Sequence, residues 1–133
     1  MARIVRPAEQ PQIDRGNGAT TVPLFLKETG ATSFISGIST FQPGVVVPMH
    51  SHNVDEMVTV LEGSGECEVE GVVTPVSAFD TSFIPGGEVH CFRNTGDVQM
   101  KILWVYASTD VTRTFADTGV TVPHLSEADR ISR

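Results

Sequence analysis

The feature that most limits the fold of this chain is the regular return of turn-forming residues. From Ser33 onward, short segments rich in Val, Ile, Thr and Phe are interrupted by glycine, proline or asparagine about every 8 to 12 residues. One segment, 66–70, alternates polar and apolar residues, so Cys67 and Val69 are expected to face the interior. No helical periodicity appears before residue 125. This pattern is typical of an all-β sandwich or barrel.

The chain is predicted to form one domain with less regular segments at both ends. Its 133 residues have the length of one ordinary domain, which can bury a core without disulfides. We divide it into an N-terminal arm (1–31), a barrel core (32–108) and a polar C-terminal tail (109–133). Within the tail, residues 126–129 read Ser-Glu-Ala-Asp, which resembles a helix N-cap with an acidic first turn and allows a short C-terminal helix.

Composition excludes several classes of partner. There are 16 acidic and 9 basic residues, the formal net charge is −7, and no basic stripe is present, so nucleic acid and anionic membrane are not expected as partners. No apolar stretch approaches the ~20 residues of a membrane helix, and the N-terminus lacks the apolar segment of a signal peptide. We therefore expect a cytoplasmic protein. Cys67 and Cys91 have no metal-site spacing, and a disulfide between them is allowed but not required.

Three histidines and one glutamate form a candidate metal site. His50 and His52 stand two residues apart, so on a strand they would project from the same face. Glu56 opens the next apolar segment after a short link, and a turn there would bring its carboxylate to both imidazoles. His90 lies much later and joins them only through the tertiary fold, whereas His124 falls in the polar tail and is expected to be exposed. Three neutral imidazoles and one carboxylate suit Fe, Mn, Ni, Co or Zn.

A histidine taken alone is more often a surface or hydrogen-bonded core residue than a ligand, so the spacing of the set decides the interpretation. That spacing resembles the two sequence motifs of the cupin superfamily. The first motif is matched at Gly44, His50, His52, Glu56 and Gly63. The second is matched from its proline onward at Pro85, Gly86, Gly87, Glu88, Val89, His90 and Asn94.

The resemblance has one departure and a clear implication. The second cupin motif usually opens with a glycine six residues before the proline, and here Phe79 takes that position, which leaves the local turn unsettled but not the ligands. The resemblance implies a jelly-roll barrel, or double-stranded β-helix. It also implies one divalent transition metal ion held by His50, His52, Glu56 and His90.

Three further residues are predicted to contact a substrate. If Glu56 and His90 face inward, Val58 and Phe92 do so too, because they lie two residues further along the same strands. In segment 101–107, Tyr106 shares a face with Ile102 and Trp104, but the sequence does not say which face of that strand lines the cavity. Tyr106 can offer its hydroxyl to a ligand. We therefore predict Val58, Phe92 and Tyr106 as substrate contacts and assign no catalytic residue.

The expected ligand is a small organic molecule. Arg93 alternates outward, and no inward arginine is evident near the motifs, which favours a neutral, enolic or aromatic molecule over a strongly anionic one. Four protein ligands leave two positions of an octahedral metal open, as in catalytic sites. The resemblance permits dioxygenases, decarboxylases, isomerases and lyases, and fold does not choose among them.

Two functional hypotheses follow. The first is a metal-dependent enzyme, with a dioxygenase-like oxidoreductase favoured over a non-redox decarboxylase, isomerase or lyase. The alternative is a non-catalytic, metal-containing protein that binds or senses a small molecule. We also expect a homodimer, because exposed sheet edges are commonly paired and cupins that resemble this chain are often dimers, with segments 22–26 and 118–122 as candidates to pair with a partner.

Overall fold

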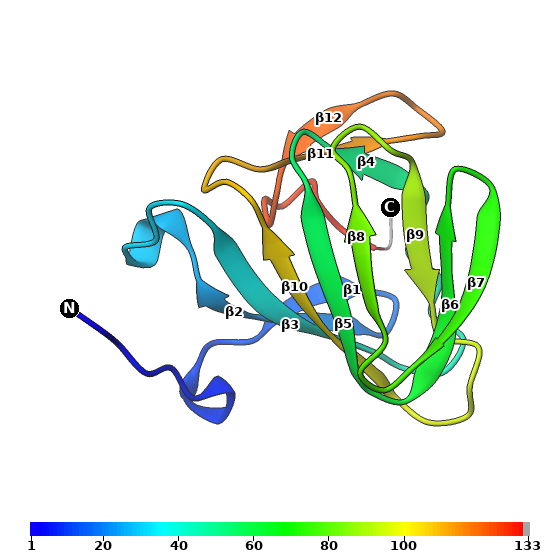
Figure 1. Ribbon diagram of the computed structural model, residues 1–133, viewed down its shortest axis with the longest axis horizontal. Helices are drawn as coiled ribbons and strands as arrows, with labels where there is room; N and C mark the ends of the chain where they lie inside the picture. Colours follow the sequence, from blue (N-terminus) through cyan, green and yellow to red (C-terminus); the bar gives the residue numbers. More distant parts are fainter. Residues whose placement is uncertain (132–133) are drawn as a thin grey trace.

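The computed structural model describes residues 1–131 and contains two six-stranded antiparallel sheets that face each other (Figure 1). The first sheet has the order β1 (Ile13–Gly16), β2 (Ala19–Phe25), β3 (Ile35–Phe41), β10 (Met100–Tyr106), β5 (Glu56–Glu62) and β8 (Thr81–Ile84). The second has the order β12 (Thr121–Pro123), β11 (Thr112–Phe115), β4 (His50–His52), β9 (His90–Arg93), β6 (Ser64–Val69) and β7 (Val72–Ser77). Two 3-10 turns, η1 (Pro7–Glu9) and η2 (Lys27–Thr29), are the helical elements of the described chain. The all-β jelly-roll prediction is confirmed.

Strict alternation along the central strands produces the core. In β10, Ile102, Trp104 and Tyr106 are buried, whereas the residues between them are only partly buried. The neighbouring strand β5 aligns Val58 with Trp104 and Val60 with Ile102, so the inner faces of both strands form one apolar layer. Fully burying a side chain of this kind stabilises the fold by roughly 1.5–3 kcal/mol. The same alternation places Glu56 on the inner face, opposite Tyr106.

The two ends of the chain complete the sheets. Residues 1–31 supply β1 and β2, and β2 pairs with β3. Within the described chain, β1 covers only residues 19–21 on the other side of β2, so residues 22–25 pair with β3 along one side alone. Residues beyond 108 supply β11, which pairs with β4, and β12, which forms the edge of the second sheet. The last two residues of the predicted tail, 132 and 133, lie outside the described residues.

The short C-terminal helix that the sequence allowed is not formed. Residues 124–129 instead form turns, in which Ser126 N–H donates to Pro123 O at 3.2 Å and Asp129 N–H donates to Ser126 O at 3.0 Å. The reason is that Asp129 does not remain an exposed acid of a first helical turn. Its side chain is fully buried and accepts a hydrogen bond from the Leu125 backbone N–H at 2.8 Å.

Phe79, the departure from the second motif, occupies a left-handed turn. Its φ of 73° lies in the region that favours glycine, its side chain is 78% exposed, and its N–H donates to Val60 O at 2.6 Å. The turn that a glycine would serve is therefore kept, with phenylalanine in a costly conformation.

Cys67 and Cys91 are both buried and free of any disulfide. Within residues 1–131, no helix is long and apolar enough to cross a membrane.

Candidate metal centre

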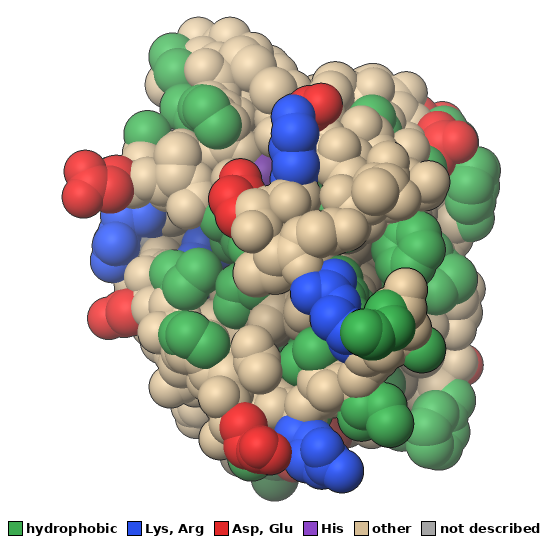
Figure 2. Space-filling view, turned by 90° about the vertical axis from the view of Figure 1, so that its left-hand side faces the viewer, with side chains coloured by type: hydrophobic (Ala, Val, Ile, Leu, Met, Phe, Trp, Pro, Cys, Tyr) green, Lys and Arg blue, Asp and Glu red, His purple; other side chains and the backbone are tan. Residues whose placement is uncertain are grey.

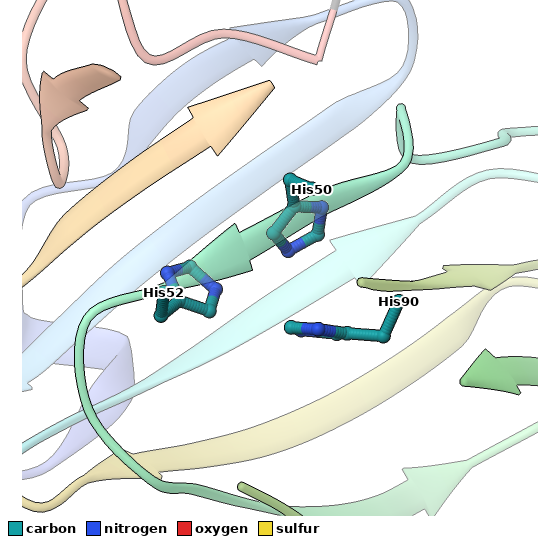
Figure 3. A group of neighbouring side chains, drawn as sticks. All are labelled: His50, His52 and His90. Carbon is teal, nitrogen blue, oxygen red and sulfur yellow. The ribbon is translucent and has the colours of Figure 1, made fainter. Parts of the chain in front are cut away.

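Three imidazoles converge from neighbouring strands of the second sheet. His50 and His52 are the first and last residues of β4, and both are buried on its inner face. His90 begins β9 and is paired with His50 across the two strands. The ring nitrogens of the three histidines that could bind a metal all lie within 4.8 Å of one another (Figure 3). The fold thus makes the long-range contact with His90 that the spacing alone could not establish.

Glu56 lies beside two of these rings. Its Oε1 is 3.1 Å from Nε2 of His90 and 3.7 Å from Nε2 of His52, and its side chain is buried. Metal–nitrogen bonds of ~2.1 Å place neighbouring ligand atoms ~3–3.5 Å apart. The separations of Glu56 from His90 and His52 are therefore close to those expected around one ion.

The outer nitrogen of each imidazole is held by a backbone carbonyl. The Nδ1 atoms of His50, His52 and His90 lie 2.7, 3.0 and 2.9 Å from the carbonyl oxygens of Pro48, Thr112 and Glu88. A carbonyl oxygen only accepts, so each Nδ1 carries the proton and each Nε2 is left as a donor of electrons to a metal. Such outer contacts orient the rings as metal-binding histidines require.

The charge states of the four groups also suit a dication. Burial lowers the pKa of His50 well below its ordinary value and that of His52 to about 4, so both are neutral at pH 7. Burial alone would raise the pKa of Glu56, but its hydrogen bond with His90 and the adjacent imidazoles lower it, so it is a carboxylate. Both nitrogens of His90 face acceptors, although a neutral imidazole has only one N–H. A positive group, a proton or a metal ion, therefore belongs between His90 and Glu56.

The centre opens onto a small internal cavity. The cavity has a volume of about 40 Å³, enough for an ion with a few waters, whereas a cavity of ~150 Å³ holds benzene. Phe92 and Tyr106 line it, and the Tyr106 hydroxyl lies 3.1 Å from Nε2 of His52. The face of β10 that lines the cavity is thus the one that carries Ile102, Trp104 and Tyr106. Val58 is buried in the core and is not among the cavity-lining residues.

His124 was expected to be exposed, and that prediction is wrong. Its ring packs edge-on against Trp104 and Tyr106, with centroids 5.0 and 4.8 Å away, and lines the cavity. Burial lowers its pKa well below the ordinary value, so it is neutral. A surface groove of about 270 Å³, lined by Leu26 and Lys27 among others, also reaches His124. Figure 2 shows histidine atoms in a hollow on this face, beside basic and acidic side chains. His124 therefore separates the outer groove from the inner cavity.

Two buried arginines also line the cavity, which corrects the expectation that no arginine points inward. Arg15 of β1 and Arg113 of β11 are only 4% and 6% exposed. A local signal for Arg113 existed, because Val111, Arg113 and Phe115 alternate with polar residues as an inward face would. Arg15 likewise stands two residues after Ile13. Neither arginine was predicted, because both lie far from the two motifs in the sequence.

Comparisons of the sequence and of the structure with known proteins agree on one family. The profile of the cupin domain matches residues 37–106. Protein SchB of Streptomyces halstedii is 33% identical over 104 residues, which cover 77% of this chain and 75% of SchB. Polyketide synthase CurC of Streptomyces cyaneus is 32% identical over 96 residues, 71% of this chain and 62% of CurC. A 5-nitrosalicylic acid 1,2-dioxygenase of Bradyrhizobium sp is 39% identical over 61 residues, 46% of this chain and 30% of that protein. The polyketide cyclase RemF of Streptomyces resistomycificus shares the fold, with a TM-score of 0.74 and 21% identity over 98% of this chain and 91% of RemF.

Proposed function

The chain belongs to the cupin family, and we propose that it is a metal-dependent enzyme acting on a small organic molecule. The observation that carries the proposal is the convergence of three histidines and Glu56, with all three outer histidine nitrogens occupied by backbone carbonyls. His50, Glu56 and His90 of this group line a cavity. A structural metal site is closed by its protein ligands, whereas this centre faces open space. We assign these four residues as ligands of one Fe, Mn, Ni, Co or Zn ion.

The residues around the centre have separable tasks. A bound ion would supply a Lewis acid that polarises a carbonyl oxygen of the substrate. Tyr106 is buried, which raises its pKa well above the ordinary value, so it keeps its proton and can donate a hydrogen bond to a substrate oxygen. Phe92 and Ile102 provide apolar walls that exclude water. A ring-sized substrate exceeds the 40 Å³ cavity, so its entry requires movement of His124, which stands between groove and cavity.

A non-redox reaction of an enolisable carbonyl compound is the first candidate. Its support is the similarity to CurC, which covers 71% of this chain and is named a polyketide synthase. Polyketide chains carry carbonyl groups whose neighbouring C–H bonds become more acidic when the oxygen is polarised. The protonated Tyr106 hydroxyl beside the centre suits such a substrate.

An O₂-dependent dioxygenase is the second candidate. Its support is the 39% identity to the 5-nitrosalicylic acid 1,2-dioxygenase, which covers a smaller part, 46%, of this chain. Both candidates place the same four residues around the metal, and they differ in whether turnover consumes O₂. A non-catalytic small-molecule sensor would bind metal and ligand without turnover.

Metal content, thermal stability and turnover together test the proposal. The purified protein should hold close to one transition metal ion per chain, and His50→Ala should lose it. Because His124 lies in the cavity but outside the proposed ligand set, His124→Gln is the matched control and should keep the metal. Metal at about 100 times its Kd should stabilise the wild type by about 2.7 kcal/mol, so chelated wild type and His50→Ala should melt at similar temperatures.

Two results would contradict the metal assignment. A wild type that refuses added Mn, Fe, Co, Ni and Zn would end the proposal, and so would a His50→Ala variant that binds metal normally. Incubation of the loaded protein with β-diketones and salicylates, with and without O₂, separates the two reactions. Tight ligand binding without product in either atmosphere would favour the sensor.

A homodimer stays part of this proposal. Among the described strands, β7 and β8 are sheet edges that carry exposed apolar side chains, including Val72 at 66% and Phe83 at 68%. Pairing commonly covers such edges. Light scattering at tens of micromolar should give twice the chain mass, and a monomer would argue against the dimer.

A further inference from the structure

We propose that Arg113, backed by Arg15, forms a carboxylate-binding subsite in the cavity, so that the substrate is an organic acid. This inference rests on the proposed function, because it names the substrate class of the same site. It replaces the sequence-based expectation of a neutral ligand, which assumed that no arginine points inward.

Arg113 stands next to the metal centre by strand pairing. In the β4–β11 pair it is the partner of His52, and side chains of directly opposed residues in antiparallel strands lie on the same face. His52 is buried on the inner face, so the buried Arg113 side chain points to that same interior. Both arginines line the same cavity as His50, Glu56 and His90.

Arg15 is fully engaged by the protein. Its Nη2 lies 3.2 Å from Asp129 Oδ2, and its Nε and Nη2 donate to the Asp129 carbonyl at 3.1 and 2.9 Å. Its Nη1 donates to Thr21 Oγ1 at 3.2 Å. Arg15 therefore holds Asp129 in place with little donor capacity left for a ligand.

Arg113 is engaged much less completely. Its Nε is 2.7 Å from Asp129 Oδ1, but the contact lacks the alignment of a hydrogen bond, and both atoms are otherwise without a partner. Among the side-chain hydrogen bonds and ion pairs found within residues 1–131, the one that involves the Arg113 guanidinium is this contact through Nε, and none comes from its two Nη groups. These two groups are the forked donors that bind a carboxylate with two parallel hydrogen bonds.

The charges of the cavity also call for an anion. The fixed charges around the cavity are two guanidinium groups, Arg15 and Arg113, and two carboxylates, Asp129 and Glu56. Burial keeps His50, His52 and His124 neutral. A divalent ion on the proposed ligands would leave an excess of two positive charges. Buried charge of one sign is costly unless it is compensated. Burial lowers the pKa of Arg15, and the neighbouring positive charge of Arg113 acts in the same direction, whereas Asp129 opposes the change.

Binding of acetate and its neutral analogue acetamide tests the subsite. Isothermal titration calorimetry is run on zinc-loaded and metal-free protein, with zinc content measured on every sample. The variants are Arg113→Gln and, as a matched control, Arg93→Gln, because Arg93 pairs with Glu66 and Glu68 and does not line the cavity. Since a carboxylate also binds zinc directly, Arg113→Gln and wild type are compared at equal zinc content.

Zinc-loaded wild type and Arg93→Gln should bind acetate at least about tenfold more tightly than acetamide. Arg113→Gln should lose about tenfold in acetate affinity and keep its zinc. If Arg113→Gln does not fold, Arg113→Lys, which keeps the charge but not the fork, should show a several-fold loss.

Equal acetate affinity of the Arg113 variant and wild type would overturn the subsite, as would a wild type without preference for acetate. If the protein takes up neither zinc nor any of Mn, Fe, Co and Ni, the proposed function fails. The metal-free titration then decides the subsite alone, by whether an acetate preference exists and depends on Arg113.

Discussion

Replacing Asp129 by asparagine should remove a large part of the free energy of unfolding of this protein. The Asp129 side chain is fully buried. Its Oδ2 lies 3.2 Å from Nη2 of Arg15, and its Oδ1 lies 2.7 Å from Nε of Arg113. Asparagine keeps the volume but removes the negative charge, which leaves two buried guanidinium groups without their shared counter-ion. Breaking a buried ion pair by removing one partner costs about 3–5 kcal/mol. That is a large part of the 5–15 kcal/mol that stabilises a typical domain.

Urea unfolding followed by tryptophan fluorescence measures this loss directly, because Trp104 is the single tryptophan and is buried. Arg113→Gln is the informative comparison. It keeps the pair of Arg15 and Asp129 and removes only the contact of Arg113 with Asp129 Oδ1, so the expected cost is about 1–3 kcal/mol, smaller than that of Asp129→Asn. Equal losses of unfolding free energy in Asp129→Asn and Arg113→Gln would refute the reasoning. Arg113 would then be needed for stability as much as Asp129 is, and it would not be available for a ligand.

Three further substitutions or conditions have defined outcomes. Phe79→Gly should stabilise the protein by about 0.5–1 kcal/mol in urea unfolding, because relief of a left-handed φ outweighs the entropy of glycine; a loss would show that the exposed ring is needed. Gly37→Ala should cost about 1–3 kcal/mol and shift Trp104 emission, because the added Cβ would lie 2.2 Å from that ring; unchanged stability and emission would contradict the packing. In metal-free protein, the His52 pKa of about 4 in the folded state lies below the 6.5 of an unfolded chain. Folding stability should therefore fall as pH drops from 6.5 to 4, by about 3 kcal/mol from His52 alone, and a flat profile in urea would refute the burial argument.

The strands and the centre of the site could be predicted because their determinants are local. Alternation with a period of two predicted that Glu56 and Val58 share one face of β5, and it grouped Ile102, Trp104 and Tyr106 on one face of β10 without saying which face lines the cavity. The register, which places Glu56 opposite Tyr106, decides that question. The pair His50 and His52 needed only the geometry of one strand. His90 was included through the motif resemblance, since nothing local connects it to β4. Val58 shows the limit of alternation, which identifies a buried face but not which buried residues border empty space.

The ends of the chain could not be placed in the same way. Arg15 and Asp129 are 114 positions apart, and no local pattern predicts that they meet. The acidic stretch 126–129 resembled the start of a helix because a buried ion pair and an exposed first-turn acid look alike in sequence. His124 was predicted to be exposed because it lies in a polar segment, although its ring packs against Trp104 and Tyr106.

This division has a consequence for specificity. The proposed metal ligands and the apolar walls Phe92, Ile102 and Tyr106 lie within residues 37–106, the part that matches the cupin family. Arg15, Arg113, His124 and Asp129, which bring most of the fixed charge and the boundary to the outer groove, lie outside that part. The shared core therefore carries the proposed metal ligands and apolar walls, whereas the terminal segments carry Arg15, Arg113 and Asp129, which bring most of the charge around the cavity. If the proposed carboxylate subsite is correct, the preference of this protein for an acid is a property of its terminal segments and not of the part that matches the cupin family.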